Sequence, residues 1–142
     1  MLVTYDTLPD FAAEFVARLP KTLSQRAHIV GLSGELGAGK TAFVKEVARQ
    51  LGVTASVRSP TFTVAQSYPL SHDPFRTLVH IDAYRLAPSD LDTFGWGDAA
   101  ADPKNLVLVE WPENLPGSAT DAFPRMYFKV RGEGVRDITY DT

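Results

Sequence analysis

A glycine-rich loop, GELGAGKT, occupies residues 34–41 of this 142-residue chain, between an apolar run at 28–33 and an amphipathic run at 42–51. Its spacing, G-x-x-x-x-G-K-T, is typical of loops whose backbone N–H groups wrap a phosphate chain at the positive end of a helix dipole. Glycine is needed there because a Cβ would block the curvature and the close approach of the backbone. We predict that the nucleotide-binding groups are Glu35, Leu36, Gly37, Ala38, Gly39, Lys40, Thr41 and Ala42. The alternative is a glycine-rich turn that a lysine happens to follow.

Two side chains at the end of this loop carry the chemistry of the pattern. Lys40 would bridge the terminal phosphates as a point charge, and the Thr41 hydroxyl would bind the magnesium ion that neutralises them. We therefore expect ATP or ADP and Mg²⁺ as cofactors.

Hydrolysis also requires carboxylates, and two acidic residues follow apolar strands. Asp82 comes late in LVHIDAYRL, and Glu110 directly follows LVLV. In open α/β sheets, ligands bind at the carboxyl ends of the strands, so both acids would face the phosphates. Either could hold magnesium, and the other could orient or deprotonate the attacking water. The alternative for Asp82 is a turn cap or a pair with Arg85.

The segment RSPTFTV, residues 58–64, lies where P-loop proteins often have a switch that contacts the terminal phosphate. Thr61 or Ser59 could donate a hydrogen bond there, although an ordinary turn into a strand fits equally well. Arg58 and Arg85 are candidates for stabilising transition-state charge, but a solvated or salt-bridged arginine is the commoner outcome.

The elements that must position these residues alternate between helix and strand. We expect a first helix capped by Thr7 with Asp10 and ending before Pro20, and a helix after the loop that ends at Gly52. The expected strands are 28–33, a hairpin of 63–68 and 76–86 joined by PLSHDPF, a doubly covered strand at 106–109, and a hairpin of 125–131 and 135–140. A short helix would begin at 88–89. His80 is expected to be a satisfied core histidine.

Bulk composition limits the class of protein. The length fits a single domain spanning residues 1–142, and the net charge of −3 indicates no basic face for direct nucleic-acid binding. The absence of cysteine excludes a disulfide scaffold and a thiolate metal site. The start of the sequence lacks the pattern of a signal peptide, and no apolar run is long enough to cross a bilayer. We therefore expect a cytoplasmic protein without membrane contact.

Four ordered motifs, GELGAGKTAFV, SPTFTV, HIDAYRL and LVEWPENL, resemble the bacterial TsaE family, also called YjeE. The resemblance implies an α/β fold: a P-loop NTPase-like three-layer domain with a mostly parallel central sheet plus antiparallel hairpins. It also implies a small ATPase that acts with TsaB and TsaD to form N6-threonylcarbamoyladenosine in tRNA. In that system TsaD transfers the threonylcarbamoyl group, and the ATPase supports turnover of the assembly. Contact with tRNA would be indirect, through the partner proteins.

The same resemblance implies roles for individual residues. Lys40 and Thr41 match the family's phosphate and magnesium ligands, Glu110 its second metal-site residue, and Asp82 the aspartate of a Walker-B-like element. Thr61 matches its switch threonine, Trp111 a tryptophan near the nucleotide, and Gly134 a contact from the C-terminal hairpin. The sequence departs from the family at FGWGDAAADPKN, which lacks the usual tyrosine, and in its first helix, which lacks an opening threonine.

No obvious arginine finger or water-positioning glutamine accompanies the loop, so we predict slow ATP hydrolysis by the isolated protein. Two other functions use the same loop. A small-molecule kinase would need an arginine-bearing lid and an acceptor pocket, neither of which is clear in the chain. A GTPase-like switch would need an N-K-x-D element, and EWPEN is not one.

Overall fold

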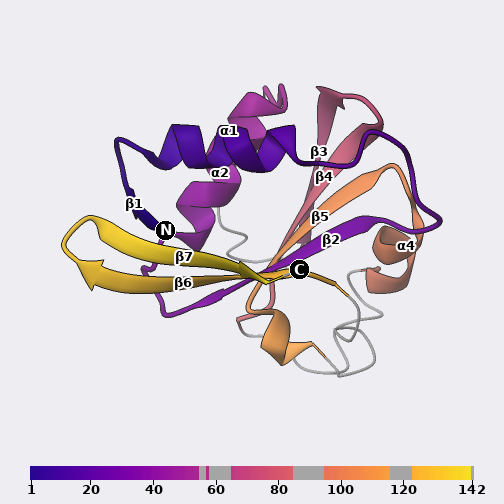
Figure 1. The fold of residues 1–142 in the computed structure, drawn as a ribbon. Helices are drawn as coiled ribbons and strands as arrows, with labels where there is room; N and C mark the ends of the chain where they lie inside the picture. Colours follow the sequence, from indigo (N-terminus) through magenta and orange to yellow (C-terminus); the bar gives the residue numbers. More distant parts are fainter. Residues whose placement is uncertain (55–56, 58–64, 85–94, 116–122, 142) are drawn as a thin grey trace.

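A seven-stranded mixed sheet forms the centre of the computed structural model, which describes residues 1–54, 57, 65–84, 95–115 and 123–141 (Figure 1). The strand order is β1-β7-β6-β2-β5-β4-β3. The strands are β1 Leu2–Thr4, β2 His28–Gly34, β3 Ala65–His72, β4 Phe75–Asp82, β5 Asn105–Glu110, β6 Arg125–Gly132 and β7 Val135–Asp141. The helices are α1 Leu8–Ala17, α2 Lys40–Gln50, α4 Trp96–Ala101 and the single 3₁₀ turn η1 Pro112–Asn114.

The middle of the sheet is parallel and its margins are antiparallel. Strands β6, β2, β5 and β4 pair in parallel, whereas β3, β7 and β1 are added antiparallel. All six residues of β5 are buried, as expected for a doubly covered strand. The predicted α/β class with a parallel centre and antiparallel hairpins is confirmed, and the carboxyl ends of β2, β4 and β5 meet at one edge of the sheet.

Helices cover both faces of the sheet and give three layers. Figure 1 shows α1 and α2 together on one side, and α4 on the other beside β5 and β2. Phe43 of α2 is fully buried beneath α1, and its ring lies 5.3 Å from that of Phe15 and 5.8 Å from that of Phe128. A smaller cluster on the opposite face includes Ala100 of α4. None of the described helices combines the length and apolarity needed to span a membrane.

The first helix begins where the sequence predicts, but its cap differs. Thr7 occupies the N-cap position without making a side-chain cap bond. Its hydroxyl instead accepts the backbone N–H of Thr4 at 2.8 Å, in the turn that leaves β1. The predicted capping arrangement with Asp10 is therefore wrong, because the hydroxyl is already engaged by the preceding turn.

The turn of the β3–β4 hairpin is shorter than predicted, and β4 ends at Asp82, before the predicted end at residue 86. Residues 69–72, expected in a turn-rich connection, belong to β3, and Pro69 pairs with Thr77 across the ladder. Because β3 is an edge strand, the missing N–H of Pro69 need not break the ladder. Strand β1 and helix α4 were not expected, and the helix predicted at 88–89 lies outside the described residues.

Candidate functional site

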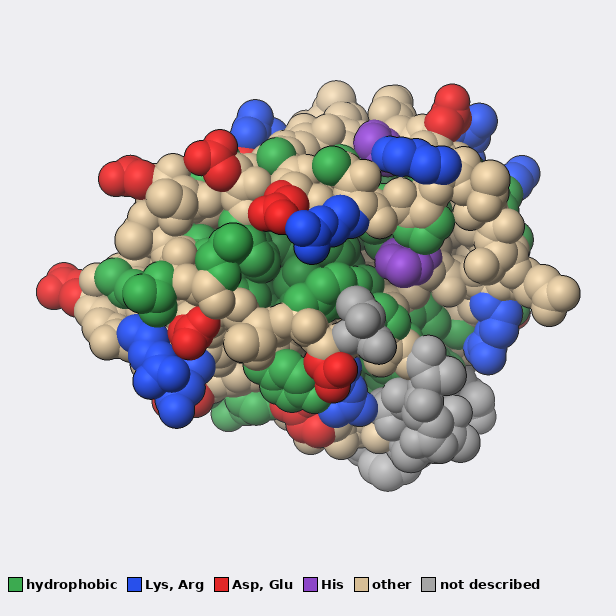
Figure 2. Space-filling view, in the orientation of Figure 1, with side chains coloured by type: hydrophobic (Ala, Val, Ile, Leu, Met, Phe, Trp, Pro, Cys, Tyr) green, Lys and Arg blue, Asp and Glu red, His purple; other side chains and the backbone are tan. Residues whose placement is uncertain are grey.

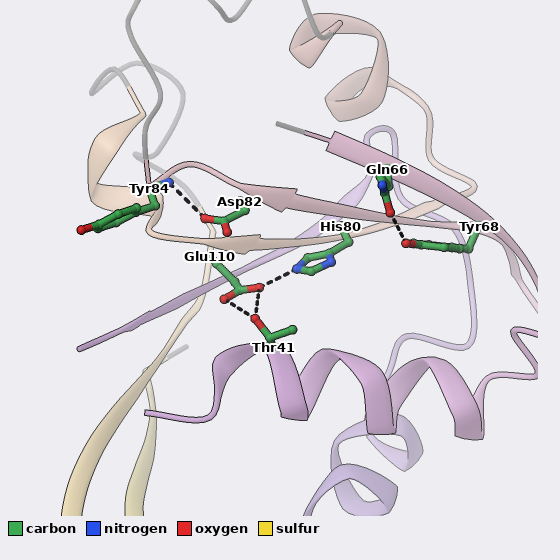
Figure 3. A network of polar contacts seen from close by, with 7 residues as sticks. All are labelled: Thr41, Gln66, Tyr68, His80, Asp82, Tyr84 and Glu110. Atoms are coloured by element: carbon green, nitrogen blue, oxygen red, sulfur yellow. Dashed lines mark hydrogen bonds and ion pairs between the residues drawn. The ribbon is translucent and has the colours of Figure 1, made fainter. Parts of the chain in front are cut away.

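A cavity of about 240 Å³ opens at the carboxyl edge of the parallel strands. The loop after β2 and the first turn of α2 form one wall, and the ends of β4 and β5 form the other (Figure 3). Its lining residues are Leu36, Gly37, Ala38, Gly39, Lys40, Thr41, Ala42, Asp82, Tyr84, Glu110 and Trp111. The topology thus brings together most of the site residues predicted from the sequence.

Glycine is required at two positions of the loop. A Cβ on Gly34 would lie 2.4 Å from the carbonyl oxygen of Phe128, and one on Gly39 would lie 2.3 Å from a guanidinium nitrogen of Arg136. Gly39 also has a φ of 98°, in the region that L residues with a side chain rarely adopt. The loop therefore holds the tight curvature that the sequence pattern predicts.

Lys40 is 5% exposed, and its side chain folds back over its own loop. The Nζ atom donates to the carbonyl oxygens of Gly34 and Glu35, the latter at 2.8 Å, and lies 4.2 Å from the ring centroid of Trp111. Burial lowers the pKa of Lys40, against the opposing effect of nearby carboxylates, of which Glu110 contributes most. An incoming phosphate oxygen would give this ammonium group a stronger acceptor than a neutral carbonyl.

A chain of hydrogen bonds joins α2, β5 and β4 beneath the cavity (Figure 3). The Thr41 hydroxyl donates to the carboxylate of Glu110, with oxygen–oxygen distances of 2.9 and 3.0 Å. On the other side, His80 Nε2 lies 2.6 Å from Glu110 Oε2. The expectation that His80 is a core histidine is confirmed, since it is 0% exposed, but its satisfaction is only partial, because the buried Nδ1 has no hydrogen-bond partner in the described structure.

Asp82 ends β4 at the same level as Glu110 ends β5, because the two residues are partners in the parallel ladder. This confirms the predicted placement of both acids at the strand ends. Asp82 lines the cavity, and one of its carboxylate oxygens accepts the backbone N–H of Tyr84 at 3.1 Å. The turn contact considered as an alternative is thus present, and it fixes the carboxylate at the cavity wall.

Trp111 adopts a left-handed backbone conformation with φ of 62°, the only described residue other than glycine to do so. Its backbone N–H donates to the carbonyl oxygen of Leu32 in β2 at 3.0 Å, and its ring lies 5.1 Å from that of Tyr84. Backbone strain of this kind persists where the surrounding structure overdetermines it, often at functional sites. The indole consequently covers one side of Lys40.

Two predicted nucleotide contacts have a different placement. Glu35 contributes a backbone carbonyl to Lys40, but it is not among the residues that line the cavity. Gly134 lies in the turn between β6 and β7, also outside the lining, with φ of 70° and Tyr5 as its neighbour. Thr61, together with Ser59, Arg58 and Arg85, lies outside the described residues.

One residue near the loop was missed by the sequence analysis. Arg136 of β7 is 5% exposed, and its guanidinium carbon lies 4.9 Å from the ring centroid of Tyr5. Its buried Nε has no hydrogen-bond partner among the described residues, its Nη2 donates to the Tyr5 hydroxyl at 3.5 Å, and its Nη1 lies against Gly39. The sequence of β7 could have predicted this burial, because alternate residues of a strand share a face and Arg136 therefore lies on the same inward face as Ile138.

The side chains fit a magnesium ion that arrives with phosphates. Thr41 and Glu110 bring a hydroxyl and a carboxylate together at the foot of the loop. Among the residues that the structure describes, no group of three or more His, Cys, Asp or Glu forms a protein-only metal cage. Magnesium in nucleotide sites usually takes one or two protein oxygens and completes its shell with phosphates and water, which matches this donor set.

Comparison with known proteins places the chain among biosynthetic proteins of one family. A family profile described as "Threonylcarbamoyl adenosine biosynthesis protein TsaE" matches residues 7–138. The tRNA threonylcarbamoyladenosine biosynthesis protein TsaE of Bacillus subtilis is 32% identical over 129 residues, 88% of this chain and 76% of that protein. The Streptomyces coelicolor protein of that name is 40% identical over 111 residues, 76% of this chain and 72% of its own. The Synechocystis one is 38% identical over 91 residues, 62% of this chain and 56% of its own. A crystal structure of Bacillus YdiB superimposes with a TM-score of 0.57 at 25% identity, covering 99% of this chain and 84% of YdiB.

Proposed function

Because this chain belongs to the TsaE family, we propose that it is an ATPase that supports N6-threonylcarbamoyladenosine formation in tRNA. It binds ATP or ADP together with Mg²⁺ in the cavity at the glycine-rich loop. It hydrolyses ATP slowly when alone, and it acts in the cytoplasm with TsaB and TsaD.

The observation that carries this proposal is the contact of Thr41 with Glu110 below a buried Lys40. These three residues come from the loop, the start of α2 and the end of β5, and they converge on one cavity with the loop's backbone. A hydroxyl, a carboxylate and an ammonium group at the N-terminus of a helix match the charges of a magnesium–triphosphate.

The residues divide the work of binding and hydrolysis. Backbone N–H groups of residues 37–42 donate to the phosphates, and Lys40 exchanges its carbonyl acceptors for phosphate oxygens. A bound Mg²⁺ neutralises phosphate charge. Glu110 and Thr41 would supply the protein oxygen atoms that bind this ion. Asp82 orients or deprotonates the attacking water. Trp111 keeps water away from one side of Lys40.

Two features support slow hydrolysis and indirect contact with tRNA. No arginine is among the residues that line the cavity in the described parts of the chain, so transition-state charge is incompletely neutralised by the protein alone. Contact with a partner can complete the site. The net charge of −3 opposes direct binding to a polyanion, so tRNA is reached through TsaB and TsaD.

Calorimetry with Mg-ATP, Mg-ADP and Mg-GTP, followed by analysis of the products, tests the proposal. We expect ATP and ADP to bind in preference to GTP, and we expect ADP and inorganic phosphate as products. Multiple-turnover tRNA modification with TsaB and TsaD should require the protein and fail with Lys40→Ala. Lys45→Ala, which changes an exposed lysine of the same helix, is the matched control. Preferential GTP binding would indicate a GTPase-like switch, and phosphate transfer to a metabolite a kinase.

A further inference from the structure

We propose that His80 is the positioning residue for Glu110, holding this carboxylate in place while Thr41 exchanges its hydrogen bond for a divalent cation. The inference rests on the proposed function of the cavity and adds a residue to it. His80 is not among the residues that line the cavity but contacts one of them, Glu110, so it acts through this carboxylate and does not touch the nucleotide.

The parallel ladder creates this contact. His80 pairs with Leu108, and Asp82 pairs with Glu110, so the histidine lies two residues before the cavity on the same face of β4 as Asp82. That face is turned toward α2, where Thr41 lies in the first turn of the helix (Figure 3). The imidazole therefore reaches Glu110 from the strand, while the Thr41 hydroxyl reaches it from the helix.

Of the two groups that contact Glu110, His80 is the donor that stays in place. His80 is 0% exposed and Glu110 is 4% exposed, and their contact is 2.6 Å. The Thr41 hydroxyl carries a single proton, which the two carboxylate oxygens share. The short contact to a carboxylate assigns the imidazole proton to Nε2, and Nδ1, which has no partner in the described structure, is left as the bare nitrogen.

Cation binding changes the hydrogen bond of Thr41 to Glu110 and leaves that of His80 unchanged. A hydroxyl that gives a lone pair to a cation can no longer keep its present orientation toward Glu110. A glutamate side chain has three rotatable bonds, so it needs a second anchor to stay at the site. The Nε2–H of His80 supplies that anchor, in the manner of the outer hydrogen bonds that orient metal ligands.

Two variants separate the donor from the bulk of the ring. His80→Gln keeps an N–H that can reach Glu110, and His80→Leu fills similar space without a donor. We expect His80→Leu to raise the Mg²⁺ concentration for half-maximal ATP binding at least tenfold, with metal-free ATP affinity changed less than twofold. His80→Gln should stay within threefold of the unmodified protein. In a Glu110→Gln background, His80→Leu should add less than twofold.

A spectroscopic signature tests the assignment without nucleotide. Nitrogen-15 NMR of the metal-free protein should show a proton on Nε2 of His80, and this signal should shift in Glu110→Gln. His28 and His72 provide the internal reference. Should His80→Leu fail to fold, His80→Asn, whose amide is too short to reach Glu110, replaces it as the variant without a donor.

The outcomes distinguish this inference from the function it rests on. If the unmodified protein binds Mg-ATP and the donor-free variants need no more Mg²⁺, the positioning role is refuted while the ATPase proposal stands. If His80→Gln is as impaired as His80→Leu, the ring merely fills space, and the inference fails again. If the unmodified protein binds no nucleotide, both fail together.

Discussion

Two cavities of the molecule differ in size and in chemistry. One of about 410 Å³ lies between α1 and the sheet, where Figure 2 shows hydrophobic side chains gathered in a hollow. Its lining residues are Met1, Phe11, Glu14, Phe15, Arg18, Leu19, Pro20, His28, Met126, Ile138 and Tyr140. The cavity at the glycine-rich loop has little more than half that volume. Size therefore does not locate the chemistry, because the larger space lacks groups arranged to hold phosphate.

The charged groups of the two cavities explain the difference. At the larger one, Arg18 pairs with Glu14 at 2.6 Å in an exposed contact between successive turns of α1. Such a pair satisfies itself and contributes little to stability. At the smaller one, Lys40 lines the cavity, and its ammonium group donates to the neutral backbone carbonyls of Gly34 and Glu35. Of these two cavities, the smaller one thus contains a buried cation that an anionic ligand would bind more strongly than its present carbonyl partners do.

Replacing Lys40 should have the largest effect on the difference in ligand binding between the two cavities. Lys40→Met removes the charged donor that would bind the terminal phosphates, and loss of two charge-assisted bonds predicts about 100- to 1,000-fold weaker ATP binding. Calorimetry measures this loss, and Lys45→Met is the control. Unchanged affinity in Lys40→Met would show that the small cavity is not the phosphate site.

The same lysine makes the stability of the nucleotide-free protein depend on pH. Burial lowers the pKa of Lys40 below its ordinary value near 10.5, so between those two values the unfolded chain binds more protons than the folded one. Stability should therefore rise with pH in that window, and below it the buried charge destabilises the fold. Lys40→Met should be more stable at neutral pH and should lack this rise, as chemical denaturation at several pH values would reveal.

Asp82→Asn should slow ATP hydrolysis about 100-fold, the usual range for loss of a general base or of a residue that orients water. The fold should be kept, because the amide oxygen can still accept the N–H of Tyr84. Initial rates of phosphate release measure the effect. Glu14 is an acid at the larger cavity, and Glu14→Gln should leave the rate unaltered. Equal losses in both variants would contradict the assignment of hydrolysis to the smaller cavity.

Arg136→Met should weaken ATP binding about tenfold, as expected for removal of one cationic group beside the loop. The guanidinium lies against Gly39 and is buried, so its charge acts on the loop with little screening by water. Titrations at low and high salt would measure the change. Arg18→Met, at the rim of the larger cavity, provides the reference, and the two variants behaving alike would refute a role for the buried charge.

Phe15→Ala changes the larger cavity and should have the smallest effect on ATP binding at the smaller one. Phe15 is 6% exposed and packs on Phe43, so its truncation should cost about 3 kcal/mol of folding stability. ATP affinity, measured below the melting temperature, should change less than twofold. A large loss of affinity would mean that the apolar cavity and the loop are coupled.

The loop and the two strand-end acids were predictable because each depends on local pattern. G-x-x-x-x-G-K-T fixes the loop, and Asp82 and Glu110 each end an apolar strand, so a parallel sheet must bring them to one edge. The contact of Thr41 with Glu110 follows once β2 and β5 are neighbours.

What the sequence could not give depends on pairing between distant segments. His80 has the pattern of a core residue, and only the register of β4 against β5 turns it into a partner of Glu110. Arg136 reaches the loop because β7 pairs with β6, which in turn pairs with β2. The three-residue β1 carries no periodic signal of its own, since its place depends on β7.

Both margins of the sheet are poor templates for a further strand. At one end, the outermost described strand is the three-residue Leu2–Thr4, and at the other it is a strand with Pro69 in its middle. Shortness and proline are devices by which natural sheets resist growth from molecule to molecule. The architecture that brings the catalytic candidates to one edge therefore also protects the protein against aggregation through its strands.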